Sequence, residues 1–208
     1  MSVSALPIEQ AAHAATDHPS VPDEWPAPLS TMHYDSGWRH AMDSVNPDAV
    51  RRALATGTFN HIDMVIGYPD FGWTDADFAS FEDAGYIVAR ITQRDPGDIL
   101  KCSIGDYEPG AMSKLGLRGF IVGRNGFRPG TASGYSDLNN LPSMGQVLAG
   151  LHYWVWCAKW PAYPTAAEVS QIRAMLRPGA RLAAIQYRNV ALADVDLSVV
   201  LDPDWHRS

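Results

Sequence analysis

Short strand-like runs alternate with helix-like segments along most of the chain, and this alternation restricts the fold more than any other feature. Short runs, most of them rich in β-branched, aliphatic or aromatic residues, predict eight strands, at residues 39–42, 61–68, 86–91, 99–105, 131–136, 152–158, 181–187 and 195–200; the fifth is poorly apolar. The segments between them predict helices at residues 48–55, 75–84, 112–122, 142–148 and 166–176. Strands joined by such crossovers pair in parallel, so we expect an α/β fold: a compact, irregular (β/α)8 TIM-like barrel.

Two of the predicted helices carry clear start and stop signals. Thr74 precedes Asp77 at the spacing of an N-cap and an acidic third helical residue, and Thr165 precedes Glu168 in a full capping box. Gly85 follows the first of these helices and Pro178-Gly179 follows the second, and both are expected to end them.

The length of the chain and its N-terminal composition suggest one domain with an appendage. Barrels of this class typically need about 250 residues, so a chain of 208 residues is expected to replace some helices with loops. Residues 1–35 hold several prolines among Ala, Ser, His and acidic residues, which predicts an extended arm before a barrel at residues 36–208. A polar arm has little apolar surface with which to order itself, so we expect it to pack on another protein chain. Packing back on its own domain is the alternative.

Composition narrows the range of partners. The net charge is −7 and Lys and Arg do not cluster, which argues against nucleic acid and anionic membrane surfaces. Seven Trp and eight Tyr permit stacking on sugar rings, although packing in the core explains most of them. Cys102 and Cys157 each lie in an apolar run, which is typical of small buried residues rather than of a disulfide or a metal pair.

Targeting and cofactor motifs are not evident in the sequence. The N-terminus lacks the basic and apolar regions of a signal peptide, and no stretch approaches 18 consecutive apolar residues. We therefore expect a chain that is made in the cytoplasm and has no membrane partner. A Gly-rich phosphate loop, a His-x-x-His spacing and a Gly-x-Ser-x-Gly elbow are also missing, so the sequence predicts neither a metal ion nor a cofactor.

Two carboxylates occupy the position that most suggests chemistry. Asp106 and Glu108 follow the apolar run 99–105 and precede Pro109-Gly110. If the run is a strand, both side chains point to the same face at its carboxyl end, where barrels of parallel strands carry their reacting groups. An Asp-x-Glu pair also occurs by chance in solvated loops, so the pair alone leaves both interpretations open.

A series of short motifs carries a family resemblance over about residues 39–202. In order they are Met42-Asp43-Ser44, Val65-Ile66-Gly67-Tyr68, Trp73-Thr74-Asp75-Ala76-Asp77-Phe78, Asp106-Tyr107-Glu108-Pro109-Gly110, Gly134-Tyr135-Ser136, Tyr153-Trp154-Val155, Ile185-Gln186-Tyr187 and Val195-Asp196-Leu197-Ser198-Val199-Val200. With these motifs the chain resembles the glycoside-hydrolase-like barrels of actinobacteria and their phages. Those barrels are relatives of the Chalaropsis-type lysozymes, which cleave the glycan of peptidoglycan.

The resemblance implies catalytic and substrate-binding residues. Four acids match the catalytic positions of the family: Asp43 after the first strand, Asp106 and Glu108 after the fourth, and Asp196 in the last. In the family the Glu protonates the departing glycosidic oxygen, and a neighbouring Asp orients the N-acetyl group of the substrate or stabilises the cationic transition state. The likeness also implies a substrate groove lined by Tyr135, Trp154, Trp156, Gln186 and Tyr187.

Two functions of different classes stay open at this point. The first is a phage-borne, glycoside-hydrolase-like protein that acts on cell-wall peptidoglycan through carboxylate acid–base chemistry. The second is a catalytically silent structural subunit of a phage particle, in the tail or capsid, whose barrel is a scaffold or a glycan grip. The expected partners are a cell-wall glycan and, through the N-terminal arm, other protein chains of a virion.

Overall fold

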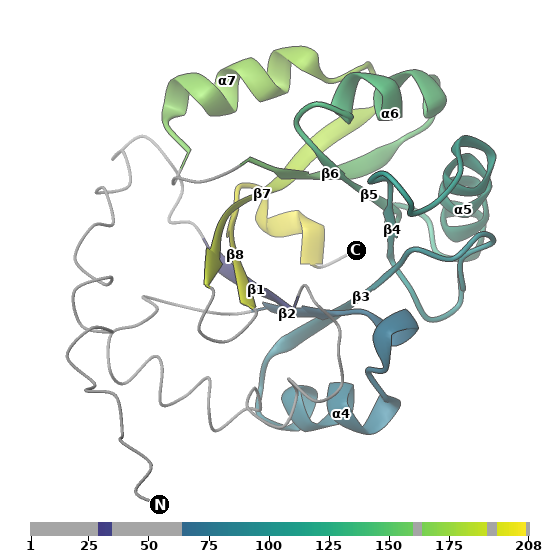
Figure 1. Cartoon of the computed structure of the whole chain (residues 1–208), viewed down its shortest axis with the longest axis vertical. Coiled ribbons are helices and arrows are strands. Elements are labelled where there is room, and N and C mark those ends of the chain that lie inside the picture. Colours follow the sequence, from purple (N-terminus) through teal and green to yellow (C-terminus); the bar gives the residue numbers. More distant parts are fainter. Residues whose placement is uncertain (1–28, 35–63, 160–163, 191–194, 207–208) are drawn as a thin grey trace, which may run out of the picture.

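The computed structural model describes residues 29–34, 64–159, 164–190 and 195–206, and there the chain forms an α/β fold (Figure 1). The strands are β1 (Leu29–Tyr34), β2 (Met64–Gly67), β3 (Ile87–Thr92), β4 (Ile104–Asp106), β5 (Ser133–Asp137), β6 (Tyr153–Ala158), β7 (Ala180–Val190) and β8 (Val195–Val200). The described helices are α4 (Asp75–Asp83), α5 (Lys114–Phe127), α6 (Leu141–Val147) and α7 (Ala166–Met175), with short 3-10 helices η1 (Pro69–Phe71) and η2 (Pro203–His206). The helix predicted at residues 48–55 lies outside the described residues.

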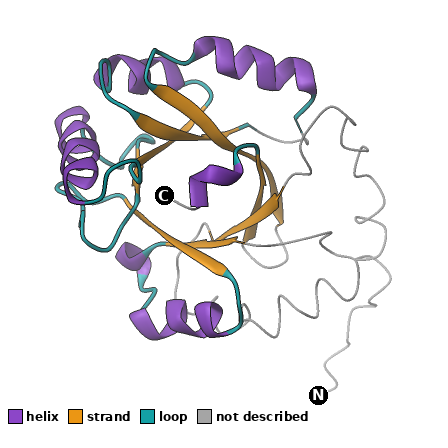
Figure 2. Ribbon diagram, turned by 180° about the vertical axis from the view of Figure 1, so that it is seen from behind, coloured by secondary structure: helices purple, strands orange, loops and turns teal. Residues whose placement is uncertain are grey.

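The strands form one curled, mostly parallel sheet. β1 to β7 pair in sequence order, each parallel to the next. Figure 2 shows the α-helices on the outside of the curl. β8 pairs with both β7 and β1 and runs antiparallel to them. The predicted α/β fold is confirmed, with a curled and mostly parallel sheet, whereas the full (β/α)8 TIM-like barrel is not.

The length of the connection before β8 explains its direction. β7 ends at Val190 and β8 begins at Val195, so only residues 191–194 join them. A parallel pair needs a crossover of about a dozen residues or more, whereas an antiparallel pair needs only a short turn. β8 therefore begins at the carboxyl end of the parallel strands and finishes at their amino end.

The two faces of the sheet carry separate clusters of buried side chains. Along β6, Trp154 and Trp156 belong to the inner cluster, which fills the interior of the curl. Val155 and Cys157 belong to the outer cluster, which packs the sheet against the helices. This alternation follows from the two-residue period of a strand, and it decides which side chains can meet at either end of the interior.

Both predicted helix starts are confirmed. Thr74 and Asp77 form a capping box: the Thr74 N–H donates to Oδ2 of Asp77 at 2.7 Å, and the Asp77 N–H donates to Oγ1 of Thr74 at 3.3 Å. Thr165 and Glu168 form the same motif at the start of α7. Gly85, just after α4, has a φ of 90°, a left-handed conformation that favours glycine.

Two sequence-based boundaries, the start of the domain and the end of α5, differ clearly from the structure. β1, at Leu29–Tyr34, lies inside the predicted arm 1–35, so the sheet begins earlier than the predicted domain start at residue 36. The predicted first strand, residues 39–42, lies outside the described residues, as do residues 1–28 of the arm. α5 continues to Phe127, five residues past its predicted end at 122, even though it contains several glycines.

The predicted strand 99–105 is mostly a turn, and β4 contains only Ile104–Asp106. The carboxylate of Asp98 accepts hydrogen bonds from the N–H groups of Leu100 and Lys101, and its carbonyl accepts from the N–H of Cys102. An Asp side chain that bonds the backbone two residues on stabilises a turn, which overrides the apolar content of the run.

Candidate active site

Asp106, the last residue of β4, is fully buried and is held by three donors. Its Oδ2 atom accepts hydrogen bonds from Nε2 of Gln93 at 2.8 Å and from the hydroxyl of Tyr68 at 3.2 Å. Its Oδ1 atom accepts from the backbone N–H of Glu108 at 3.0 Å. An ionised carboxylate only accepts, so three converging donors match the charged form of Asp106.

Glu108 lies beside Asp106, in the turn beyond the end of β4. Its side chain is half-buried, and its backbone carbonyl accepts from the N–H of Ala111 at 2.9 Å. Pro109 and Gly110 of this turn are exposed. The predicted pair therefore stands at the carboxyl end of the sheet, with one acid buried and the other at the rim.

Asp196 is placed near the same end by strand register. It pairs with His33 near the end of β1 and with Asn189 near the end of β7. Because β8 is antiparallel, its second residue lies level with the carboxyl ends of its neighbours. Asp196 was expected at the carboxyl end of the sheet because the last strand was predicted to be parallel, and that reason was wrong. In the antiparallel β8 the backbone of Asp196 still lies at the carboxyl end, because it is near the start of the strand.

The fourth predicted acid, Asp43, lies outside the described residues. The described first strand ends at Tyr34, and the acid that follows it directly in the sequence is Asp35, which was assigned to the arm. Asp35 also lies outside the described residues. The role of Asp43 as the acid after the first strand therefore stays a prediction.

Tyr135 and Gln186 of the predicted groove lie inside the curl, and Tyr135 is the neighbour of Asp106 on the next strand. Tyr135 pairs with Asp106 in the β4–β5 register, and its hydroxyl donates to Oε1 of Gln186 at 2.5 Å. Both side chains are buried, and the ring of Tyr135 lies 4.5 Å from that of Trp156. These residues support the wall of the site next to the acids.

The other three predicted groove residues are placed elsewhere. Trp156 is fully buried, and its indole N–H donates to Oγ of Ser198 at 3.0 Å, so it is a core residue of the interior. Tyr187 belongs to the outer cluster against the helices, since it follows Gln186 and successive strand residues point to opposite faces. Neither residue offers the solvent-facing ring that the groove prediction required.

Trp154 lies two residues before Trp156, toward the amino end of the sheet. It pairs with Ser133 and Arg181, its indole N–H donates to the Gly130 carbonyl at 2.8 Å, and the Arg181 guanidinium lies 4.3 Å from its ring centroid. The prediction that Trp154 lines the groove with the acids was wrong, because it assigned the residue to the correct strand but to the opposite end.

Two residues of the site, Tyr68 and Gln93, were missed as site residues by the sequence reasoning. Tyr68 directly follows β2, and Gln93 directly follows β3. A polar side chain placed just after a strand at the carboxyl end of a parallel sheet is the signal that could have found both.

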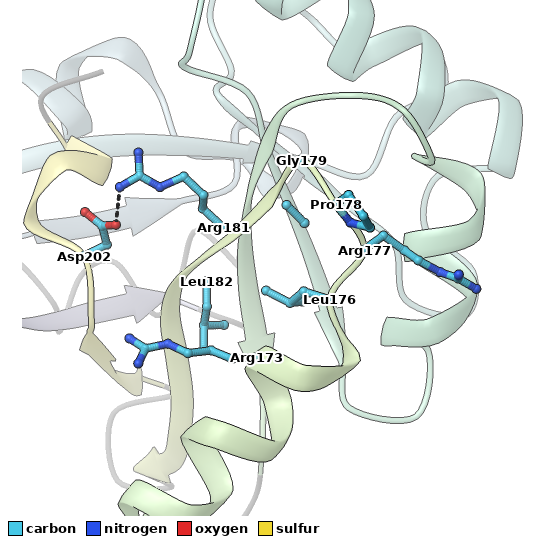
Figure 3. Close-up of a pocket in the computed structure, with 9 residues that line it drawn as sticks. Arg173, Leu176, Arg177, Pro178, Gly179, Arg181, Leu182 and Asp202 are labelled. Carbon is cyan, nitrogen blue, oxygen red and sulfur yellow. Dashed lines mark hydrogen bonds and ion pairs between the residues drawn. The ribbon is translucent and has the colours of Figure 1, made fainter.

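A depression of about 500 Å³ lies at the amino end of the sheet, away from the acids (Figure 3). Its polar lining consists of Arg173, Arg177, Arg181 and Asp202. In Figure 3 Arg181 points to Asp202, with which it forms a 2.7 Å ion pair, and Arg177 points away from it. Arg173 lies in the last turn of α7, where a cation complements the helix dipole. The ion pair and the helix dipole explain Arg181 and Arg173 as structural residues.

Within the described residues, the cysteines give no support to thiol chemistry. Burial raises the pKa of Cys102 and of Cys157 to about 12, so both thiols stay protonated at neutral pH and are poor nucleophiles. The described residues contain no group of three or more His, Cys, Asp or Glu side chains that could hold a metal ion. None of the helices in the described ranges combines the length and hydropathy needed to cross a membrane.

Comparisons with protein-family models and with curated proteins find no match. Among solved structures, a family GH25 lysozyme from Aspergillus fumigatus matches with a TM-score of 0.53 at 10% identity, over 85% of this chain and 95% of that chain. The bacterial lysozyme from Streptomyces coelicolor matches with a TM-score of 0.52 at 12% identity, over 84% of this chain and 92% of that chain. A muramidase from Acremonium alcalophilum matches with a TM-score of 0.51 at 13% identity, over 86% of this chain and 97% of that chain. At identities this low the likeness concerns the fold alone, and the chain has the fold of these lysozymes and muramidases.

Proposed function

We propose that this protein is a glycoside hydrolase that acts on the glycan of peptidoglycan through carboxylate acid–base chemistry. The proposal is supported by the shared fold with lysozymes and muramidases. It is also supported by the position of Asp106 and Glu108 at the carboxyl end of the sheet, the end at which barrel enzymes carry their reacting groups.

The single observation that carries the proposal is the unequal environment of the two acids. Asp106 is buried and accepts from Gln93, Tyr68 and the Glu108 N–H, whereas Glu108 is half-buried at the rim. Paired carboxyl groups with different environments can divide the roles of a glycosidase, one as proton donor and one as a fixed negative charge.

The roles follow from these environments. Glu108 is the general acid, which gives its proton to the glycosidic oxygen as the bond to the sugar carbon breaks. Water then adds to that carbon, and the proton that it loses goes to a carboxylate of the site. Asp106 stays ionised and either stabilises the positive charge that develops on the sugar ring or orients an N-acetyl group beside it. Asp196, whose backbone lies at the same end, is a further acid of the site.

The test is the release of reducing sugar from purified peptidoglycan by the wild type and by Glu108→Gln. The variant should keep the fold and the affinity for glycan while turnover falls by about 10²- to 10⁴-fold, the usual effect of losing an acid–base catalyst. Glu82→Gln is the matched control, because Glu82 is an exposed residue of α4. Equal activity of the wild type and Glu108→Gln would sink the assignment of the acid.

The second function, a silent subunit of a phage particle, remains a prediction, as do a phage origin and an actinobacterial host. It rested on the N-terminal arm, whose residues 1–28 lie outside the described part of the chain. The same experiment separates the two functions. A wild type that binds peptidoglycan but releases no reducing sugar from it fits a glycan grip, and not a hydrolase.

A further inference from the structure

Gln93 connects two strands at the candidate site. Thr92, the last residue of β3, pairs with Gly105 of β4, so the next residue along β3 comes level with Asp106. The two-residue period of the strand places Gln93 on the same face as Ile91, which belongs to the inner cluster. From there Nε2 of Gln93 reaches Oδ2 of Asp106 at 2.8 Å.

Asp70 fixes the backbone from which Gln93 extends. One oxygen, Oδ2, accepts from the Thr92 hydroxyl at 2.7 Å and from the Gln93 N–H at 2.8 Å. The other oxygen pairs with Nε of Arg94 at 2.9 Å. The Asp70 side chain is only 11% exposed, whereas that of Arg94 is 72% exposed. Asp70 thus binds three consecutive residues, 92–94, of which Gln93 is the middle one.

We propose that Gln93 is a positioning residue that holds the Asp106 carboxylate in its charged, oriented form for the reaction, with Asp70 fixing Gln93 in turn. This inference rests on the proposed function. An amide side chain suits the role because it donates a hydrogen bond without carrying a charge and does not titrate. It therefore remains a donor over the whole pH range in which Asp106 is ionised.

The other titratable groups around Asp106 set the background for this role. Tyr68 donates from the end of β2, Glu108 follows on the same segment, and Tyr135 lies opposite on β5. On the β3 side the charges of Asp70 and Arg94 are paired with each other. Gln93 is thus the neutral donor between that ion pair and the buried acid.

The first test compares Gln93→Leu with the wild type in peptidoglycan hydrolysis. The substitution keeps the approximate size and removes the donor, so kcat should fall by about tenfold or more while KM changes little. Gln171→Leu on the exposed face of α7 makes the same chemical change away from the site and should leave both constants unchanged. A fall in kcat that is matched by Gln171→Leu, or no fall in Gln93→Leu, overturns the proposal.

Gln93→Glu supplies a readout that a purely structural role would not move. The introduced carboxyl can donate to Asp106 only when it is protonated, and when ionised it repels Asp106. Activity of this variant relative to the wild type should therefore recover as the pH is lowered, whereas Gln93→Leu should show no such recovery. A constant ratio of variant to wild-type activity across the pH range contradicts the proposal.

Carbon-13 NMR of the Asp106 carboxyl, assigned with Asp106→Asn, tests the inference without reference to activity. In Gln93→Leu this carboxyl should titrate at higher pH than in the wild type, because a hydrogen bond to its charged form is removed. An unchanged titration overturns the positioning role. A shifted titration in a protein that hydrolyses no glycan would keep the Gln93–Asp106 link and reject the proposed function instead.

Discussion

The indole N–H of Trp205 donates a 2.9 Å hydrogen bond to Oγ of Ser133, although 72 positions separate the two residues. Trp205 belongs to η2, which follows β8, and Ser133 begins β5. The ring centroid of Trp205 lies 6.3 Å from that of Trp156 in the interior. η2, which lies within the ring of strands in Figures 1 and 2, therefore covers the inner cluster from the amino end.

We expect Trp205→Ala to lower the free energy of unfolding by about 3–5 kcal/mol, the usual cost of truncating a buried Trp. The side chain is buried, and its loss leaves both a cavity beside Trp156 and an unpaired hydroxyl at Ser133. Urea unfolding monitored by circular dichroism measures the change. The control is Leu115→Ala on α5, where the side chain is 84% exposed and a change within about 0.5 kcal/mol is expected. Equal effects of the two substitutions would mean that η2 is not part of the core.

Trp156→Phe should cost stability and leave glycan binding intact. The ring is fully buried and its indole N–H bonds Ser198, so the substitution removes one buried hydrogen bond at a cost of about 1–2 kcal/mol. A residue that stacks on sugar would show the opposite pattern. Binding to insoluble peptidoglycan, measured beside urea unfolding, distinguishes the two. Weaker binding by a variant of wild-type stability would restore Trp156 to the substrate groove.

Local signals in the sequence predicted the parts of the fold that depend on neighbouring residues. The capping boxes at Thr74 and Thr165 are complete within four residues, so their side chains specify a helix start wherever the helix packs. β6 and β8 were also predicted closely, since aromatic and β-branched residues fill them. The pair Asp106 and Glu108 was found for the same reason, because a strand end and a Pro-Gly break enclose it.

Features that depend on distant partners could not be read from the sequence. The direction of β8 depends on the length of a connection and on its neighbours in the sheet, not on the composition of the strand. The apolar run after Asp98 is compatible with either a strand or a turn. The Asp98 carboxylate favours the turn, because it accepts hydrogen bonds from the backbone of the run. Gln93 has no motif of its own, and its role arises only where β3 and β4 place it beside Asp106.

The start of α7 predicts a dependence of stability on acid pH. A hydrogen bond from Lys159 and a second from the Thr165 backbone N–H lower the pKa of Glu168 from 4.5 to about 2. A carboxyl with a depressed pKa stabilises the fold above its unfolded value, and this contribution is lost as the pH falls from about 4.5 to 2. Glu168→Gln can still act as a capping residue but cannot pair with Lys159 as a charge.

Between these two pH values the free energy of unfolding should therefore fall more steeply for the wild type than for Glu168→Gln. Urea unfolding at a series of pH values provides the slopes. Glu82→Gln, an exposed substitution on α4, should keep the slope of the wild type. Parallel curves for the wild type and Glu168→Gln would show that the Lys159 contact contributes nothing in solution.

The two candidate catalytic acids should respond differently to the same kind of substitution. In Asp106→Asn, the hydrogen bonds from Gln93, Tyr68 and the Glu108 N–H are no longer made to a negative charge. Hydrogen bonds to a charged group contribute more to stability than those to a neutral amide, so we expect a loss of about 1–3 kcal/mol of stability together with a large loss of turnover. Glu108→Gln changes a half-buried side chain at the rim and should lower turnover with little change in stability.

Urea unfolding and reducing-sugar release, measured on the same preparations, test this contrast. Glu82→Gln, an exposed substitution on α4, is the control and should change neither stability nor turnover. If Asp106→Asn is as stable as the wild type, the three donors do not hold a charged Asp106, and the division of roles between the two acids fails with them.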